Sequence, residues 1–197
     1  MYIARVLYPV EVLGPGKRVG IWFCGCERRC KGCSNPELWD FDPRFQTTPE
    51  TVLRLIRQIA AQYPIDGFTL TGGDPMYQQE EMQKLIALLR PISPDILVYT
   101  GYRIEELPPS ALWGISVLID GEYLEDRNHA SPLRGSDNQR IHFLDPSVKP
   151  LYGPCLAETG NRIQNFTLPD GIVSVGIHKP GFLRTLDQNV KTKGLKP

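Results

Sequence analysis

Four of the five cysteines in this 197-residue chain lie within ten consecutive residues, as Cys24, Cys26, Cys30 and Cys33. They follow a short apolar run at residues 18–23 that is typical of a strand, and the glycines and charged residues between them indicate a loop. An odd number of cysteines, crowded in this way, does not suit the disulfide framework of a secreted domain. The cluster therefore indicates a metal or redox site on a loop at the carboxyl end of a strand.

Strand and helix patterns alternate after the cysteine loop. The spacing of apolar residues predicts helices over about residues 49–63, 78–90 and 104–107, and strands over residues 67–71, 96–99, 115–119 and 140–145. This order is typical of an α/β fold with mostly parallel strands, in which functional residues gather at the carboxyl ends of the strands. A full eightfold barrel needs about 250 residues, so the chain is long enough only for an open, partial barrel.

Overall charge and hydropathy exclude several classes of protein. The 22 basic residues balance the 22 acidic ones, so no overall positive field is present to hold nucleic acid or an acidic membrane surface. No apolar run reaches the roughly 18 residues of a membrane span, and residues 1–10 lack the pattern of a secretory signal. We therefore expect a cytoplasmic protein without nucleic-acid or membrane partners.

The pattern changes after residue 146, which divides the chain into a core of residues 1–146 and an extension of residues 147–197. The extension is rich in Pro and Gly, and residues 162–168 and 172–177 predict a β-hairpin around a turn at Pro169, Asp170 and Gly171. It either docks a partner protein, forms a flap over the open side of the sheet, or covers apolar surface of the core. We favour docking as the expectation from sequence.

Cys26, Cys30 and Cys33 form a CxxxCxxC pattern. Three thiolates bind three irons of a cubane 4Fe-4S cluster and leave the fourth iron open to a substrate, which indicates catalysis rather than electron storage. The alternatives are a zinc site, or a cluster fully ligated in the manner of a ferredoxin, with Cys24 as the fourth ligand. Only one residue separates Cys24 from Cys26, and this spacing does not favour binding of one metal ion by both thiols.

The sequence Gly72-Gly73-Asp74-Pro75 follows a predicted strand. Two glycines allow backbone to approach a ligand closely, and an acidic residue beside free carbonyls accepts hydrogen bonds from an ammonium group. A plain strand-to-helix turn is the alternative interpretation of these residues. If they bind a cofactor, a valine at Gly73 is expected to block the cofactor while leaving the cluster intact.

The CxxxCxxC spacing resembles that of the radical S-adenosylmethionine enzymes. The ordered set of motifs narrows the resemblance to the activating proteins of anaerobic (class III) ribonucleotide reductases, over roughly residues 2–145. These motifs are YPVE at 8–11, GPGKR at 14–18, the cysteine loop, TGGDP at 71–75, TGY at 100–102, Asp120-Gly121 and RGSDNQ at 134–139. The resemblance implies an open partial (β/α) barrel that holds a 4Fe-4S cluster on Cys26, Cys30 and Cys33.

The resemblance also implies a set of residues that bind S-adenosylmethionine. They are Gly32, Ser34, Thr71, Gly72, Gly73, Asp74, Thr100, Gly101, Tyr102, Asp120 and Arg134. One position departs from the family pattern. Many activating proteins have Lys two residues after the aspartate that corresponds to Asp120, whereas this chain has Glu122 there. A cation for the cofactor carboxylate is thus missing at that position.

The activity implied by the resemblance is reductive cleavage of S-adenosylmethionine to a deoxyadenosyl radical, with an electron from a flavodoxin or ferredoxin. The radical installs a glycyl radical on a partner enzyme, the large subunit of an anaerobic ribonucleotide reductase. One alternative is a radical enzyme acting on another glycyl radical protein or a peptide, and a second is a non-catalytic iron-sulfur carrier or zinc module. His129, His142 and His178 show no spacing that suggests a shared metal, and Cys155 reads as a free thiol.

Overall fold

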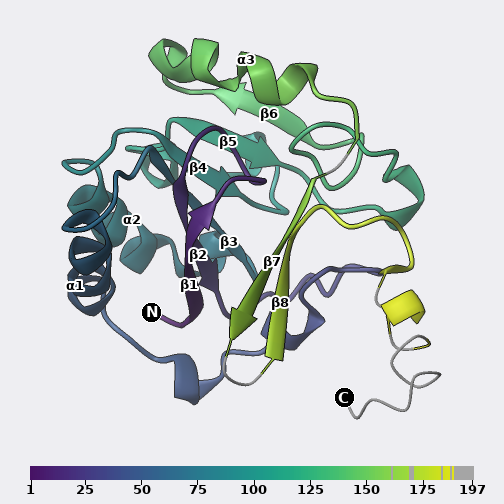
Figure 1. The fold of residues 1–197 in the computed structure, drawn as a ribbon, viewed down its shortest axis with the longest axis horizontal. Coiled ribbons are helices and arrows are strands. Elements are labelled where there is room, and N and C mark those ends of the chain that lie inside the picture. The colour runs from purple at the N-terminus through teal and green to yellow at the C-terminus, as the bar shows by residue number, and fades with distance from the viewer. Residues whose placement is uncertain (161, 169–170, 183, 187, 189–197) are drawn as a thin grey trace.

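A six-stranded sheet forms the centre of the molecule, with strands in the order β1-β2-β3-β4-β5-β6 (Figure 1). The computed structural model describes residues 1–160, 162–168, 171–182, 184–186 and 188. The strands are β1 (Ile3–Val10), β2 (Arg18–Phe23), β3 (Gly67–Gly72), β4 (Ile96–Tyr99), β5 (Val117–Asp120) and β6 (Arg140–Phe143). None of the helices described is long and apolar enough to cross a membrane.

Strands β2 to β5 are parallel, whereas β1 and β6 pair antiparallel with their neighbours at the two edges. The mostly parallel α/β sheet predicted from the sequence is therefore confirmed. The sequence analysis did not include β1, which contains Pro9 and is only partly buried. Proline is tolerated at a sheet edge because the missing N–H costs no ladder hydrogen bond there.

Helices α1 (Pro49–Ala60) and α2 (Gln79–Leu89) cover one face of the sheet. Thr48 caps α1 by accepting a hydrogen bond from the N–H of Thr51, and Pro49 occupies its first turn, as the sequence predicts. The helix ends at Ala60, before the predicted residue 63. Short 3-10 turns at Ile104–Glu106 and Pro109–Leu112 take the place of a helix between β4 and β5.

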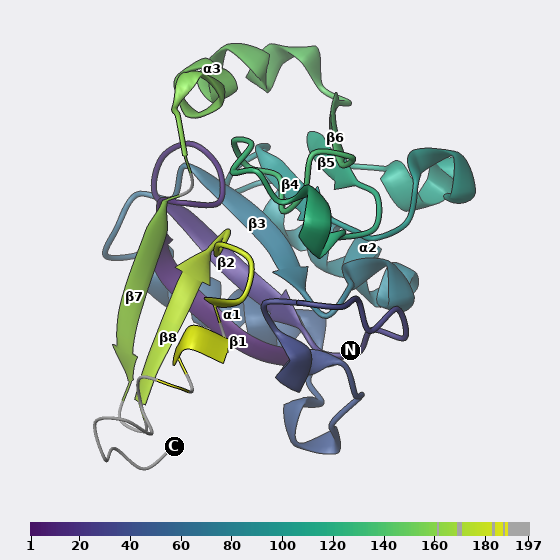
Figure 2. The ribbon, with the colours of Figure 1, turned by 90° about the vertical axis from the view of Figure 1, so that its right-hand side faces the viewer.

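The other face of the sheet is covered by the extension (Figures 1 and 2). Strands β7 (Ile163–Leu168) and β8 (Gly171–Gly176) form the predicted hairpin, and the predicted turn residues 169–170 lie outside the described residues. Val175 packs with Val10 and Trp22, next to the sheet edge formed by β1 and β2. The extension therefore supplies part of the second apolar layer of the fold.

Helix α3 (Lys149–Ala157) was not predicted. Its sequence, KPLYGPCLA, contains Gly153 and Pro154, which are poor helix formers and hide the helical pattern. Tyr152 on this helix is fully buried and packs against Leu97, Val117 and Ile119 of strands β4 and β5. Tertiary packing of this one side chain outweighs the weak helix propensity of the segment.

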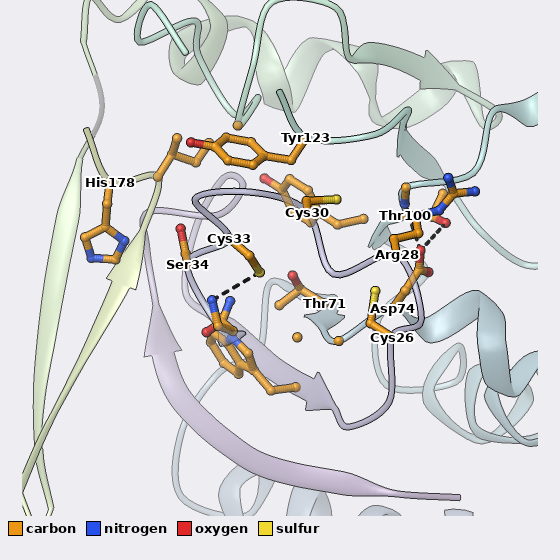
Figure 3. A pocket seen from close by; sticks show the side chains of 18 of the residues that line it. Cys26, Arg28, Cys30, Cys33, Ser34, Thr71, Asp74, Thr100, Tyr123 and His178 are labelled. Atoms are coloured by element: carbon orange, nitrogen blue, oxygen red, sulfur yellow. Dashed lines mark hydrogen bonds between the residues drawn. The ribbon is translucent and has the colours of Figure 1, made fainter. Parts of the chain in front are cut away.

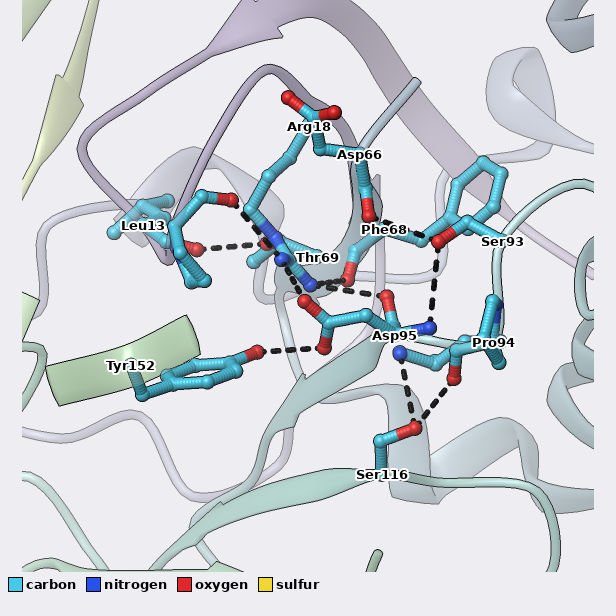
Figure 4. Close-up of polar contacts among 12 residues, drawn as sticks. Leu13, Arg18, Asp66, Phe68, Thr69, Ser93, Pro94, Asp95, Ser116 and Tyr152 are labelled. Carbon is cyan, nitrogen blue, oxygen red and sulfur yellow. Dashed lines mark hydrogen bonds and ion pairs between the residues drawn. The ribbon is translucent and has the colours of Figure 1, made fainter. Parts of the chain in front are cut away.

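A buried charge ties α3 to the sheet (Figure 4). Arg18 has no exposed surface, and its guanidinium donates to Asp95 Oδ2 at 2.5 Å and to Thr69 Oγ1 at 2.8 Å. The hydroxyl of Tyr152 donates to the other oxygen of Asp95 at 2.8 Å. A buried ion pair is tolerated only when its remaining hydrogen-bonding groups are satisfied, so each member of this network depends on the others.

We expect Tyr152→Phe to lower the free energy of unfolding by about 1–2 kcal/mol, because it removes a donor to a buried carboxylate and retains the ring. Tyr63→Phe, at a tyrosine that is 54% exposed, is the matched control and should change it by less than about 0.5 kcal/mol. Urea unfolding of both variants measures the difference. Equal stabilities for the two would show that the Tyr152 hydroxyl contributes nothing.

Candidate functional site

The cysteine loop leaves the carboxyl end of β2 and is fixed by backbone hydrogen bonds. The N–H of Cys24 donates to Tyr2 O at 3.0 Å and that of Cys26 donates to Trp39 O at 2.7 Å. Cys26, Cys30 and Cys33 line one pocket (Figure 3). Cys24 is buried outside the lining of this pocket, and its thiol donates to Asp40 O at 2.6 Å.

Burial raises the pKa of all three pocket thiols. The pKa of the Cys30 thiol is raised to about 11, because the negative charge of the Glu122 carboxylate adds to the effect of burial. Glu122 Oε1 lies 4.0 Å from Cys30 Sγ, so an acidic side chain and not a cation stands against this pocket thiol. Metal binding deprotonates such thiols.

The donor set fits an iron-sulfur cluster. Three soft sulfur ligands face a common cavity, and thiolates are the ligands that such clusters use. Within the described ranges, no three His, Cys, Asp or Glu side chains converge as ligands around a single metal ion do. The three thiolates that hold an iron-sulfur cluster do not have to meet at one point, because each of them binds a different iron.

Asp74 holds the turn at residues 72–75, here called the glycine turn, to the end of the neighbouring strand β4. Its Oδ2 accepts from the N–H of Gly101 at 2.8 Å and from Thr100 Oγ1 at 3.0 Å, while Oδ1 accepts from the N–H of Met76 at 3.0 Å. Burial raises the pKa of this carboxyl, and these hydrogen bonds oppose the rise. Asp74 thus organises the ends of β3 and β4, and the turn presents backbone to the pocket.

The glycine turn and the cysteine loop are in direct contact. The N–H of Gly73 donates to Phe23 O at 2.8 Å, and the N–H of Asp74 donates to Gly25 O at 3.0 Å. A Cβ atom built at Gly73 would lie 2.5 Å from Gly25 O, closer than real Cβ atoms approach backbone. A side chain at Gly73 therefore pushes on the loop that carries the cysteines, and the expectation that a valine there spares the cluster does not follow from this geometry.

The structure brings most of the residues implied by the resemblance to this pocket. Those that line it are Cys26, Cys30, Cys33, Ser34, Thr71, Gly72, Gly73, Asp74, Thr100 and Gly101. Four of them do not line it, namely Gly32, Tyr102, Asp120 and Arg134. Gly32 lines a second, adjacent pocket, and Tyr102 lies beneath the guanidinium of Arg28.

Asp120 and Arg134 have partners within the protein. Asp120 has no exposed side-chain surface and accepts from Arg140 Nε at 3.0 Å and from the N–H of Ile104 at 2.7 Å. Burial would raise the pKa of Asp120, but the hydrogen bonds from these groups hold it below its usual range. Arg134 donates to Gln139 O at 3.3 Å, within its own loop.

Arg28 is a pocket residue that the sequence analysis did not single out for binding. Its guanidinium lies 4.3 Å from the centre of the Tyr102 ring, and its Nε is buried with no hydrogen-bond partner among the described residues. The side chain also packs on Gly101, where a Cβ atom would lie 2.5 Å from Arg28 Cδ. The sequence could have indicated this residue as part of the site, because Arg28 lies between Cys26 and Cys30 and so places a cation in the cysteine loop.

Residues from further regions also line the pocket. Among them are Tyr123 and Gln139 near the end of β5, Leu13 before β2, Trp22 in β2, and residues 174–178 at the end of β8 and just after it. Gln139 joins the RGSDNQ loop to the end of β5 by donating to Gly121 O at 2.8 Å. No sequence motif pointed to the hairpin as part of the site.

Comparison with known proteins identifies relatives of the core. Residues 12–142 match the family of 4Fe-4S single cluster domains. The chain is 38% identical over 141 residues to the anaerobic ribonucleoside-triphosphate reductase-activating protein of Enterobacteria phage T4, covering 68% of this chain and 90% of that protein. The protein of that name from Escherichia coli K12 is 33% identical over 147 residues, 70% of this chain and 96% of that protein. A pyruvate formate-lyase-activating enzyme of Clostridium pasteurianum is 29% identical over 79 residues, 39% of this chain and 33% of that protein.

We expect Gly73→Ala to reduce the iron and sulfide retained after anaerobic reconstitution and to lower the free energy of unfolding by about 1–3 kcal/mol, because the added carbon overpacks against Gly25. Gly153→Ala is the matched control, since nothing lies within 4 Å of a Cβ atom there. Iron and sulfide analysis with urea unfolding tests both variants. Full cluster content in Gly73→Ala would contradict the coupling of the two loops.

Proposed function

This chain belongs to the 4Fe-4S single-cluster family and, within it, to the anaerobic ribonucleoside-triphosphate reductase-activating proteins, and we propose on that premise that it installs a glycyl radical on a partner enzyme. The observation that carries the proposal is the pocket that joins three cysteine thiols to a backbone turn at the carboxyl ends of β2, β3 and β4. A 4Fe-4S cluster held there by Cys26, Cys30 and Cys33 would supply one electron to S-adenosylmethionine, whose cleavage would yield methionine and a deoxyadenosyl radical. Transfer of a hydrogen atom from a glycine Cα to that radical would give deoxyadenosine and the glycyl radical.

The proposed cluster ligands are Cys26, Cys30 and Cys33. Their thiols line the pocket, whereas the Cys24 thiol is outside its lining and donates to Asp40 O. Three protein ligands leave one iron open to a substrate. The same arrangement argues against the ferredoxin-like alternative, in which Cys24 would be the fourth ligand.

The glycine turn and Arg28 are the proposed contacts of the charged methionyl group. The turn at Gly72 and Gly73 offers backbone to the ammonium group, while Asp74 keeps the turn in place. Arg28 is a cation in the same pocket, with a guanidinium suited to a carboxylate. It provides the positive charge that Glu122 does not, at a different position in the fold.

The proposed substrate is the glycyl radical subunit of an anaerobic ribonucleotide reductase, since relatives covered over 90% or more of their length bear that name. The shorter similarity to a pyruvate formate-lyase-activating enzyme keeps another glycyl radical enzyme as the second candidate. We further propose that the sheet is the open partial barrel of the radical S-adenosylmethionine enzymes, that a flavodoxin or ferredoxin is the reductant, and that the protein is cytoplasmic.

We expect Cys26→Ala, Cys30→Ala and Cys33→Ala each to abolish the cluster, because each removes the only thiolate of one iron. Cys24→Ala and Cys155→Ala are the matched controls and should retain wild-type iron and sulfide after anaerobic reconstitution. If Cys24→Ala loses the cluster as completely as Cys30→Ala, the assignment of an open iron is wrong.

The activity itself is tested by two measurements on the reconstituted protein under reducing, oxygen-free conditions. We expect deoxyadenosine from S-adenosylmethionine, and a glycyl radical signal in electron paramagnetic resonance when an anaerobic ribonucleotide reductase large subunit is added. Absence of deoxyadenosine would contradict the proposed activity. Deoxyadenosine without a radical on this subunit, but with one on pyruvate formate-lyase, would instead select the second candidate.

A further inference from the structure

The end of the hairpin is part of the pocket that contains the three cysteine thiols. Residues 174–178, which include the end of β8, line this pocket together with Cys26, Cys30 and Cys33. They lie beyond residue 142, where the match to the 4Fe-4S single cluster family ends. This wall of the pocket is therefore built by the part of the chain that the family match does not cover.

Contacts with the core hold the hairpin in place. The side chain of Gln164 bridges the edge strand, because its Nε2 donates to Pro9 O at 2.7 Å and its Oε1 accepts from the N–H of Glu11 at 3.0 Å. Val175 is 2% exposed in an apolar cluster with Trp22. Backbone and apolar contacts of this kind position the pocket-lining residues rather than leave them on a free loop.

Ser174, which is half-buried, and His178, which is buried, form a polar pair on this wall. Ser174 Oγ lies 2.8 Å from His178 Nε2, and the imidazole stacks on Phe182 with ring centres 4.0 Å apart. The backbone of His178 is fixed as well, since its carbonyl accepts from Asn128 Nδ2 at 2.8 Å. His178 is 8% exposed, and its Nδ1 has no hydrogen-bond partner among the described residues. A buried polar atom without a partner is uncommon and requires an explanation.

The two sides of the pocket differ in chemistry. One side carries Arg28, Asp74 and Cys26, and Figure 3 shows His178 across the pocket from these residues. The hairpin side combines apolar groups such as Val175 with the neutral pair of Ser174 and His178. Burial lowers the pKa of His178, which favours the uncharged form of the ring. Apolar walls with a few neutral hydrogen-bonding groups suit a nucleoside better than an amino-acid head group.

We propose that Ser174 and His178 contact the nucleoside part of S-adenosylmethionine, so that the extension contributes directly to cofactor binding. This inference rests on the proposed function, because that function places the methionyl group at the cysteines and the glycine turn. A ligand with a charged end and a neutral heteroaromatic end is thereby bound in one orientation. The extension then acts as a wall of the binding site and not only as a cover for apolar surface.

The test uses two fragments of the cofactor on the full-length, reconstituted protein. Methylthioadenosine carries the nucleoside, and methionine carries the amino-acid group. His178→Phe keeps an aromatic ring against Phe182 and removes both nitrogens, and Ser174→Ala removes the hydroxyl. We expect each to weaken methylthioadenosine binding in anaerobic calorimetry by about five-fold, as loss of a hydrogen bond to a neutral group does. Methionine binding should be unchanged.

Ile172→Thr is the matched control, because this side chain is on the same hairpin and is 72% exposed. It should bind both fragments as the wild type does, and the melting temperatures of all variants show whether the fold is retained. If His178→Phe fails to fold, Ser174→Ala decides the question. Unchanged methylthioadenosine binding, no binding of it to the wild type, or an equal loss of both fragments would overturn the inference. Failure of the wild type to form deoxyadenosine would instead refute the proposed activity and leave the binding comparison valid.

Discussion

A sheet whose strands are buried on both faces needs a covering layer on each face, and the rest of this structure depends on that requirement. All six residues of β2 and all four of β5 are buried. Helices α1 and α2 cover one face, and α3 with the β7–β8 hairpin covers the other. Because the hairpin packs beside β1 and β2, its last residues reach the pocket at the carboxyl ends of the strands. One apolar constraint thus explains both the second layer and the composition of the site.

The site itself is a single packed unit and not a set of independent loops. Gly73 and Gly25 are in backbone contact, and Asp74 connects this turn to Thr100 and Gly101 at the end of β4. Asp74, which the sequence analysis placed among the ligand contacts, accepts hydrogen bonds from three groups of the protein. These bonds hold the turn to the end of β4, since a buried carboxylate is costly unless several donors satisfy it.

Charge around the pocket is distributed differently from the pattern that the resemblance implies. Glu122 stands against Cys30, and Arg140, a cation at this strand end, is paired with Asp120 and Glu105. Arg28 provides one from the cysteine loop, held by stacking on Tyr102. An equivalent charge can reach a ligand from another element because only its position in space matters for the electrostatic attraction.

Local patterns in the sequence determined the mostly parallel α/β order, the cysteine cluster, the glycine turn and the hairpin, because each depends on residue type and short-range spacing. The tertiary structure alone decided which of these meet. Helix α3 forms despite Gly153 and Pro154 because Tyr152 finds a buried site near Arg18 and Asp95, and no local pattern encodes that contact. The approach of His178 to the cysteine loop, roughly 150 residues earlier in the chain, likewise follows from packing of the hairpin on the sheet. Long-range contacts of this kind arise from the apolar surface that two distant segments bury together, a quantity that the sequence of either segment does not contain.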